Sequence, residues 1–280
     1  MTGHPLPTPA GRCVVLGVVN VTPDSFSDGG DWFEPEAAIA HGRALLAAGA
    51  DVVDVGGEST RPGAERPTLD EELRRVLPVV EALAADGAVV SIDTMRASVA
   101  AAALGVGAVV VNDVSGGLAD SELVEVVVAA QCPMIAMHWR GHSVGMQQRA
   151  AYGDVVADVC AALASRRDAL LAAGVLPDRL VLDPGLGFAK NAEHNWALLA
   201  HLDALVALGQ PLLVGASRKT FLGRVGVPDG APARPPRDRE NATTATSVIA
   251  AQAGVWGLRV HDVAGTLDAL AVVDLVEAHR

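Results

Sequence analysis

Short runs of apolar, largely β-branched residues alternate along the chain with longer segments rich in alanine and leucine. The short runs are apolar at every position instead of every second one, which is typical of strands buried on both faces of a parallel sheet. This pattern predicts eight strands, at Cys13–Val19, Asp51–Val55, Val89–Ile92, Val109–Val111, Met134–Met137, Leu180–Leu182, Leu212–Val214 and Leu258–Val260. It predicts eight helices after them, at Pro35–Ala48, Leu69–Ala85, Arg96–Leu104, Ser121–Ala130, Val155–Ala173, Glu193–Leu208, Arg239–Gly254 and Ala264–Ala278. Pro78 lies inside the second helix, where we expect a kink or a break.

The strand–helix pairs follow one another in order, at roughly 30 residues a unit. Eight such units favour an α/β fold, a single-domain (β/α)8 TIM barrel with its active site at the carboxyl ends of the strands. A doubly wound open sheet is the alternative, which periodicity alone does not exclude. Residues 224–241, rich in proline, glycine and charge, are expected to form a mobile loop. We expect one barrel domain over 13–280 after a flexible tail over 1–12.

Composition and charge narrow the possible functions. The formal net charge is −12, from 21 Lys and Arg against 33 Asp and Glu, and this acidic balance argues against binding of nucleic acid. Hydrophobic residues make up 50% of the chain, which excludes intrinsic disorder. The sequence shows neither a membrane-spanning run nor a secretory signal, and its three scattered cysteines predict reduced thiols. We expect a cytoplasmic protein that does not associate with membranes.

Polar residues follow every predicted strand. Asp93, Asn112 and Asp183 are short side chains at strand ends, so they should point into the mouth of the barrel. Carboxylates and amides there can pair with the edge of a flat, nitrogen-rich ring. Positive charge suited to a phosphate or carboxylate comes from Arg61, Lys219, Arg259 and His261.

A structural role is the alternative for each of these residues taken singly. The sequence Asp183-Pro-Gly can be a simple turn, and Asp93 and Asn112 can cap the helices that follow them. Their recurrence after every strand favours a binding site instead. The motifs of a nucleotide phosphate loop, a zinc protease and a serine nucleophile elbow are all missing from the sequence.

The segments at the strand ends resemble the dihydropteroate synthase family. The matching stretches come in order, one after each strand: GVVNVTPDSFSDGG (17–30), DVGGESTRPGA (54–64), SIDT (91–94), NDVSGG (112–117), MHWR (137–140), LDPGLGFAK (182–190), GASRKTFLG (215–223) and RVHDV (259–263). MHWR, HNW (194–196) and DPGLGFAK are most similar to the actinobacterial form. The resemblance implies condensation of 4-aminobenzoate with (7,8-dihydropterin-6-yl)methyl diphosphate to 7,8-dihydropteroate and diphosphate, in tetrahydrofolate biosynthesis.

The resemblance also implies a role for each matching residue. The catalytic residues would be Asp24, Arg61, Asp93 and Lys219. The pterin would be bound by Asp93, Asn112, Met137, Asp183, Gly215 and Lys219, and the diphosphate by Arg259 and His261. The 4-aminobenzoate would be bound by Thr60, Arg61, Pro62, Phe188 and Ser217. Asn20 would ligate a Mg²⁺ carried by the diphosphate, the substitution would be dissociative, and the chain would form a homodimer that sulfonamides inhibit.

Two other functions share part of this pattern. A pterin-binding methyltransferase has the same barrel and pocket, but it should lack the STRPG and SRK stretches that this chain contains. A non-catalytic paralogue could bind a pterin without converting it, but it could be expected to lose the NVTPDSFSDGG and STRPG segments. Both segments are intact here.

Overall fold

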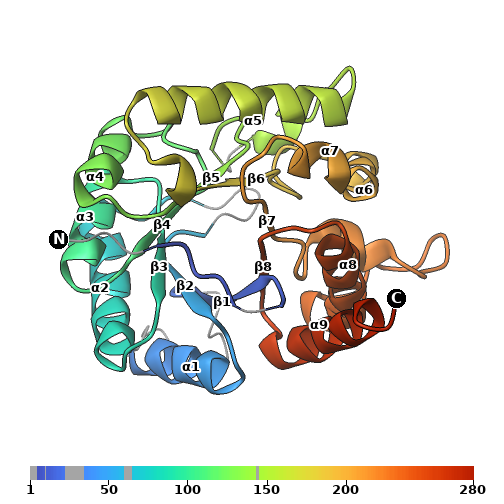
Figure 1. The fold of residues 1–280 in the computed structure, drawn as a ribbon, viewed down its shortest axis with the longest axis horizontal. Helices are drawn as coiled ribbons and strands as arrows, with labels where there is room; N and C mark the ends of the chain where they lie inside the picture. Colours follow the sequence, from blue (N-terminus) through green and yellow to red (C-terminus); the bar gives the residue numbers. More distant parts are fainter. Residues whose placement is uncertain (1–4, 10, 23–34, 60–64, 143–144) are drawn as a thin grey trace.

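The computed structural model describes residues 5–9, 11–22, 35–59, 65–142 and 145–280. In these ranges eight parallel strands form the wall of a barrel, joined in the order β6-β5-β4-β3-β2-β1-β8-β7. A parallel bridge between Leu182 and Leu212 joins the two edges of this sheet. The strands are β1 (Val14–Asn20), β2 (Val52–Gly56), β3 (Val90–Asp93), β4 (Val110–Asp113), β5 (Met134–Met137), β6 (Leu180–Asp183), β7 (Leu213–Val214) and β8 (Gly257–Val260). The predicted TIM barrel is confirmed (Figure 1).

The helices surround the strands, as Figure 1 shows. They are α1 (Pro35–Ala47), α2 (Leu69–Ala85), α3 (Ala97–Gly105), α4 (Glu122–Ala130), α5 (Val155–Ala172), α6 (Ala192–Ala200), α7 (Leu202–Val206), α8 (Glu240–Gln252) and α9 (Val263–Glu277). Helix α2 continues through Pro78, so a break there is wrong, and the alternative of a kink stays a prediction. The helix expected over Glu193–Leu208 is instead divided in two at His201.

The division between α6 and α7 has a local cause. The Nδ1 atom of the His201 ring lies 2.8 Å from the carbonyl oxygen of Ala197, the acceptor that a continuous helix would offer to the amide of His201. That amide bonds to Leu198 instead, and the backbone of His201 leaves the helical region with φ −128° and ψ 40°. The His201 ring therefore bonds the carbonyl that its own backbone amide would bond in a continuous helix.

Both faces of the strands are buried, as their continuous apolarity predicted. In β1, Val14 and Leu16 belong to a cluster inside the barrel, whereas Val15 and Val19 pack between the strands and the helices. The two clusters alternate along the strand because successive side chains point to opposite faces. The inside cluster consists of Val14, Leu16, Val52, Val110, Ile135, Val181 and Leu213.

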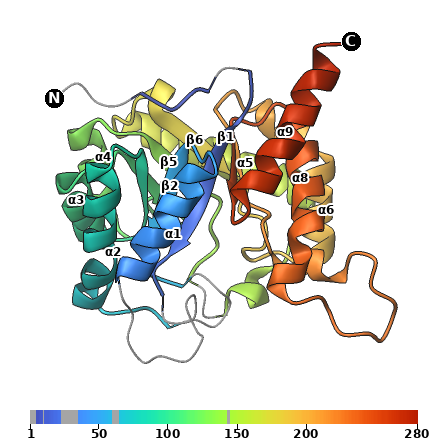
Figure 2. The same cartoon turned by 90° about the horizontal axis from the view of Figure 1, so that it is seen from below.

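The segments outside the predicted units make specific contacts. Residues 5–9 lie at the amino ends of the strands, where Trp256 Nε1 donates to the carbonyl of Pro7 at 3.1 Å (Figure 2). In the loop over 224–241, Arg239 donates to the carbonyls of Arg234 and Arg218 at 2.8 and 2.7 Å. The domain boundary at residue 13 stays a prediction. None of the helices in the described ranges has the length and apolar character that a membrane span requires.

Candidate functional site

The inner faces of the strands change from apolar to polar toward their carboxyl ends. Val52 and Val110 belong to the inside cluster. Asp54 lies two residues after Val52, and Asn112 lies two residues after Val110. Because side chains on a strand repeat every second residue, the polar groups face inward one layer further along the barrel. The same step from Ile135, Val181 and Leu213 leads to Met137, Asp183 and Gly215.

Arg259 joins the polar side chains of three strands. Its Nε donates to Asp54 Oδ2 at 2.6 Å, and its Nη2 donates to Asp93 Oδ2 at 2.8 Å. Asn112 Nδ2 donates to the same Asp54 oxygen at 2.9 Å. We call these four residues the Arg259 cluster. The structure therefore brings together three of the predicted site residues, and it shows Arg259 paired with carboxylates.

Asp54 is the member of the Arg259 cluster that the sequence did not indicate. It lies inside the predicted strand Asp51–Val55, whereas the predicted site residues follow the strand ends. A signal was nevertheless present, because Asp54 is an acid in an apolar run and shares the face of Val52. Its side chain is fully buried, and its second oxygen, Oδ1, has no hydrogen-bond partner within the described ranges.

Burial shifts the titration of the charged groups in this layer. It raises the pKa of Asp93 to about 7, against the opposing charge of Arg259. Burial also raises the pKa of Asp183, and it lowers the pKa of Lys219 to about 8, where Asp183 opposes the shift. Shifts of this kind, with specific charged partners in a buried site, are typical of functional sites.

Lys219 and Phe188 meet on the opposite side of the barrel mouth. Lys219 donates to the carbonyl of Leu186, and its Nζ lies 4.7 Å from the centre of the Phe188 ring. Phe188 also packs against a small buried cluster that contains Met137. A Cβ at Gly187, where φ is +81°, would come within 3.0 Å of Lys219 Cδ, so glycine is required for this approach.

The ends of β7 and β8 complete the described part of the site. Ser217 Oγ lies 2.9 Å from His261 Nδ1 and accepts the backbone N–H of His261 at 3.2 Å. A Cβ at Gly215 would contact Arg259 at 3.7 Å and Lys219 at 3.9 Å, which places this glycine between the two cations. Four predicted site residues lie outside the described residues: Asp24, Thr60, Arg61 and Pro62.

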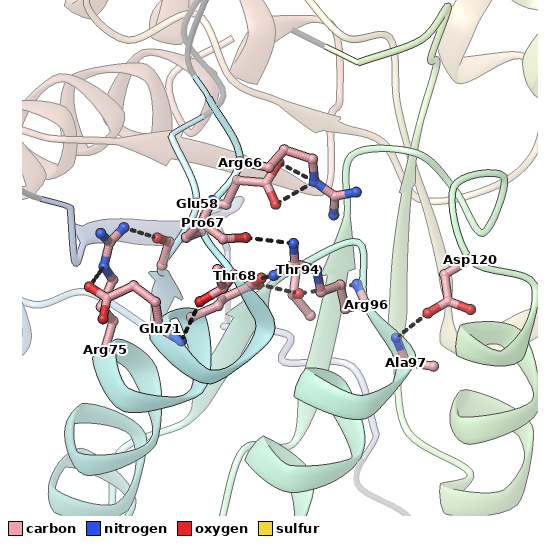
Figure 3. Close-up of polar contacts among 12 residues, drawn as sticks. Glu58, Arg66, Pro67, Thr68, Glu71, Arg75, Thr94, Arg96, Ala97 and Asp120 are labelled. Atoms are coloured by element: carbon pink, nitrogen blue, oxygen red, sulfur yellow. Dashed lines mark hydrogen bonds and ion pairs between the residues drawn. The ribbon is translucent and has the colours of Figure 1, made fainter.

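A second charged network lies between β3 and the residues that enter α2 (Figure 3). Glu72 is fully buried in α2, and it accepts from Thr94 Oγ1 at 2.6 Å and from Arg96 Nη1 at 2.7 Å. Arg96 also donates to the carbonyl of Pro67 at 2.7 Å. This network ties the residue after Asp93 to the chain that leads into α2. The sequence did not indicate it, because an acid in an amphipathic helix usually faces solvent.

Comparison with known proteins agrees with this geometry. Residues 16–261 match the family described as pterin binding enzyme. The chain is similar to the dihydropteroate synthase of Mycobacterium leprae, with 55% identity over 260 residues that cover 92% of each protein.

Solved structures agree over nearly the whole chain. The dihydropteroate synthase of Xanthomonas albilineans with 4-aminobenzoic acid aligns with a TM-score of 0.87 at 45% identity, covering 95% of this chain and 94% of the other. The Yersinia pestis dihydropteroate synthase in a sulfonamide drug complex aligns with a TM-score of 0.90 at 38% identity, covering 100% of this chain and 99% of the other. The likeness extends from the sequence motifs to the fold that carries them.

Proposed function

We infer how the site works from the premise that the chain belongs to the pterin-binding enzyme family and, within it, to the dihydropteroate synthases. Its reaction joins 4-aminobenzoate to (7,8-dihydropterin-6-yl)methyl diphosphate and yields 7,8-dihydropteroate and diphosphate. The observation that carries the placement of the site is the Arg259 cluster at the carboxyl ends of the strands. The relatives are dihydropteroate synthases, so they favour this function over the two alternatives, a pterin-binding methyltransferase and a non-catalytic paralogue.

The pterin ring is bound by Asp93, Asn112 and Asp183. Since Asn112 donates its Nδ2 proton to Asp54, its Oδ1 is the atom that accepts from a ring N–H. Ionised Asp93 and Asp183 accept from the ring in the same way, while the ammonium of Lys219 donates to the ring carbonyl. Met137 packs beside the ring, and Gly215 leaves room for it.

The substitution is dissociative. The bond between the pterin methylene carbon and the diphosphate oxygen breaks first, and its electron pair leaves with the diphosphate. Asp93 stabilises the resulting cation, and Arg259 and His261 stabilise the charge on the diphosphate. The guanidinium can do so because it has N–H donors beyond the two that bond Asp54 and Asp93. The 4-aminobenzoate nitrogen then bonds to the methylene carbon and loses a proton.

Asn20 is the proposed protein ligand of a Mg²⁺ ion. It is the half-buried last residue of β1, and its amide oxygen suits a hard cation. Within the described ranges no group of three or more acidic, histidine or cysteine side chains could hold a metal. A single neutral ligand fits an ion that arrives on a diphosphate, because Mg²⁺ in proteins commonly bonds substrate phosphates and few side chains. When bound, the ion would neutralise charge on the leaving group.

The 4-aminobenzoate lies against Phe188 and Ser217, next to the end of the pterin that reacts. Thr60, Arg61 and Pro62, which lie outside the described residues, are proposed to bind the same substrate, and Asp24, also outside them, is proposed to assist catalysis. The contact of Phe188 with Lys219 supports this arrangement, because it places the aromatic ring beside a proposed pterin ligand. The two substrates then meet at the pterin methylene carbon.

We also propose a cytoplasmic homodimer. Helices α8 and α9 pack against each other and expose large apolar side chains at Ile249, Val272, Leu275 and Val276. An apolar face of this kind favours association of a second chain. The three cysteines are free thiols, in keeping with a reducing compartment. Sedimentation of Leu275→Asp tests the dimer, which this charge should separate into monomers.

Product formation by the purified protein tests the proposal. We expect 7,8-dihydropteroate from the two substrates, at a rate that falls when a chelator removes Mg²⁺. A sulfonamide should raise the KM for 4-aminobenzoate without lowering kcat. Absence of product at saturating substrates would contradict the function, whereas a non-competitive sulfonamide would contradict the position of the 4-aminobenzoate pocket.

A further inference from the structure

The side chain of Lys190 is a buried cation with no role in the mechanism above. It is the last residue of the segment that follows β6, and only 3% of it is exposed. Its Nζ has three partners, the carbonyl oxygens of Gly185 and Phe188 at 3.0 and 3.1 Å and His138 Nδ1 at 3.0 Å. Burial lowers the pKa of Lys190 to about 7, against the opposing charge of Asp183. In its protonated form the ammonium has three protons, so each proton has one acceptor.

Opposite the protonated amine of Lys190, Nδ1 of the His138 ring is the third acceptor. Burial, followed by the charges of Lys190 and Arg140, lowers the pKa of His138 to about 3. A neutral ring that accepts at Nδ1 carries its proton on Nε2. His138 follows β5 directly, so the strand fixes the position of the ring and thereby the position of the ammonium.

The segment that Lys190 holds has an irregular backbone. Gly185, Gly187 and Ala189 have φ values of +67°, +81° and +47°, and Ala189 is strained because it has a Cβ. Side chains bond the backbone throughout this segment. Asn195 accepts from the amide of Gly187 at 2.7 Å, and Tyr152 donates to the carbonyl of Ala189 at 3.0 Å. The conformation of the segment is therefore set by side chains from outside it.

We propose that Lys190, held in place by His138, is a positioning residue for the addition of 4-aminobenzoate. Without the ammonium, the buried carbonyl of Gly185 and the partly buried carbonyl of Phe188 lose their donor, and the segment must move to satisfy them. Phe188 carries one of these carbonyls, and its ring contacts Lys219. The inference rests on the proposed position of 4-aminobenzoate against Phe188. It predicts that the movement weakens use of 4-aminobenzoate more than binding of the pterin.

Steady-state kinetics of four variants test the proposal. Lys190→Met keeps a similar volume and removes the charge, whereas Lys190→Arg keeps the charge but cannot match the same three acceptors. We expect Lys190→Met to raise the KM for 4-aminobenzoate about tenfold or more, in line with the effect of a small misplacement in an active site. The Kd of an uncharged hydroxymethyl-dihydropterin, measured by calorimetry, should change by less than about threefold. The KM of Lys190→Arg for 4-aminobenzoate should lie between that of Lys190→Met and that of the wild type.

His138 provides a matched pair that leaves Lys190 in the chain. His138→Leu removes the acceptor and should raise the KM for 4-aminobenzoate in the same direction as Lys190→Met. His138→Asn can present an oxygen near the position of Nδ1, and it should restore most of the loss. Thermal unfolding of each variant identifies any that do not fold, and either pair is sufficient for the comparison when both of its members fold.

A spectroscopic measurement reads the contact without relying on activity. In the wild type, ¹⁵N NMR should show His138 with an unprotonated Nδ1 and a protonated Nε2. A protonated Nδ1 would overturn the proposal. So would folded variants with unchanged kinetics, equal weakening of both substrates, or His138→Asn that behaves like His138→Leu. A wild-type protein that made no dihydropteroate would instead contradict the proposed function.

Discussion

The two sides of the barrel mouth are held by different kinds of contact. On the side of β2, β3, β4 and β8, the charged and amide side chains of the Arg259 cluster bond one another inside the barrel. After β6, side chains from neighbouring elements bond the backbone of residues 185–189. The first side depends on a balance of buried charge, and the second depends on the shape of a backbone segment. We therefore expect loss of a buried charge to have a large effect on either side, and loss of a single neutral hydrogen bond on the second side to have a small one.

The largest loss of stability among single substitutions is expected from breaking the Arg259 cluster. Asp54→Leu leaves Arg259 with one carboxylate and Asn112 without its acceptor, and removal of one partner from a buried ion pair costs about 3 kcal/mol or more. The free energy of unfolding in urea should fall by this amount. Asp86→Leu is the matched control, because it breaks the exposed pair of Asp86 with Arg43 and should change stability little. Equal losses in the two variants would contradict the difference between buried and exposed charge.

A second effect, which depends on pH, is expected from the protonation of Asp93. Its folded-state pKa of about 7 lies above that of the unfolded chain, so the folded protein binds the proton more tightly. The resulting stability is fully present below about pH 4 and is lost as the pH rises to about 7. Asp93→Asn should remove this part of the pH dependence. Urea unfolding of both proteins between these pH values measures it, and identical slopes would show that Asp93 titrates normally.

The smallest loss of stability is expected at residues 185–189, where side chains bond the backbone. Tyr152→Phe removes one hydrogen bond to the carbonyl of Ala189, at a cost of about 1 kcal/mol in the free energy of unfolding. Asn195 and Lys190 still hold the segment, so the KM for 4-aminobenzoate should rise by less than about threefold. A loss of activity as large as that of Lys190→Met would show that Tyr152, and not Lys190, sets the conformation of the segment.

The sequence predicted the fold and the side of the barrel that carries the site. Continuous apolar runs give buried parallel strands wherever they occur, and polar residues after such strands meet at one end of a barrel. Asp93, Asn112 and Asp183 could therefore be placed without knowledge of the structure. The pairing of Arg259 with Asp54 could not, since it joins residues 205 positions apart whose contact depends on the register of the closed barrel.

Three further features of the structure could not be predicted from the sequence, because each depends on the partner that one side chain finds in the folded chain. The role of Lys190 depends on carbonyl groups, which have no sequence signature, and on the position of His138 after another strand. Glu72 lies in a helix whose pattern suggests a solvated acid, and its burial follows only from Thr94 and Arg96 on the neighbouring unit. The break at His201 depends on one ring position. Helical periodicity contains none of this information.

The most direct test compares the two substrates in two variants, one from each side. KM values for the pterin diphosphate and for 4-aminobenzoate would be measured for Asp54→Asn and Lys190→Met against the wild type. Asp54→Asn should raise the KM for the pterin diphosphate by about tenfold or more with little change for 4-aminobenzoate, and Lys190→Met should show the reverse. Variants that both raise the same KM, or both KM values equally, would contradict separate roles for the Arg259 cluster in pterin binding and for residues 185–189 in the use of 4-aminobenzoate.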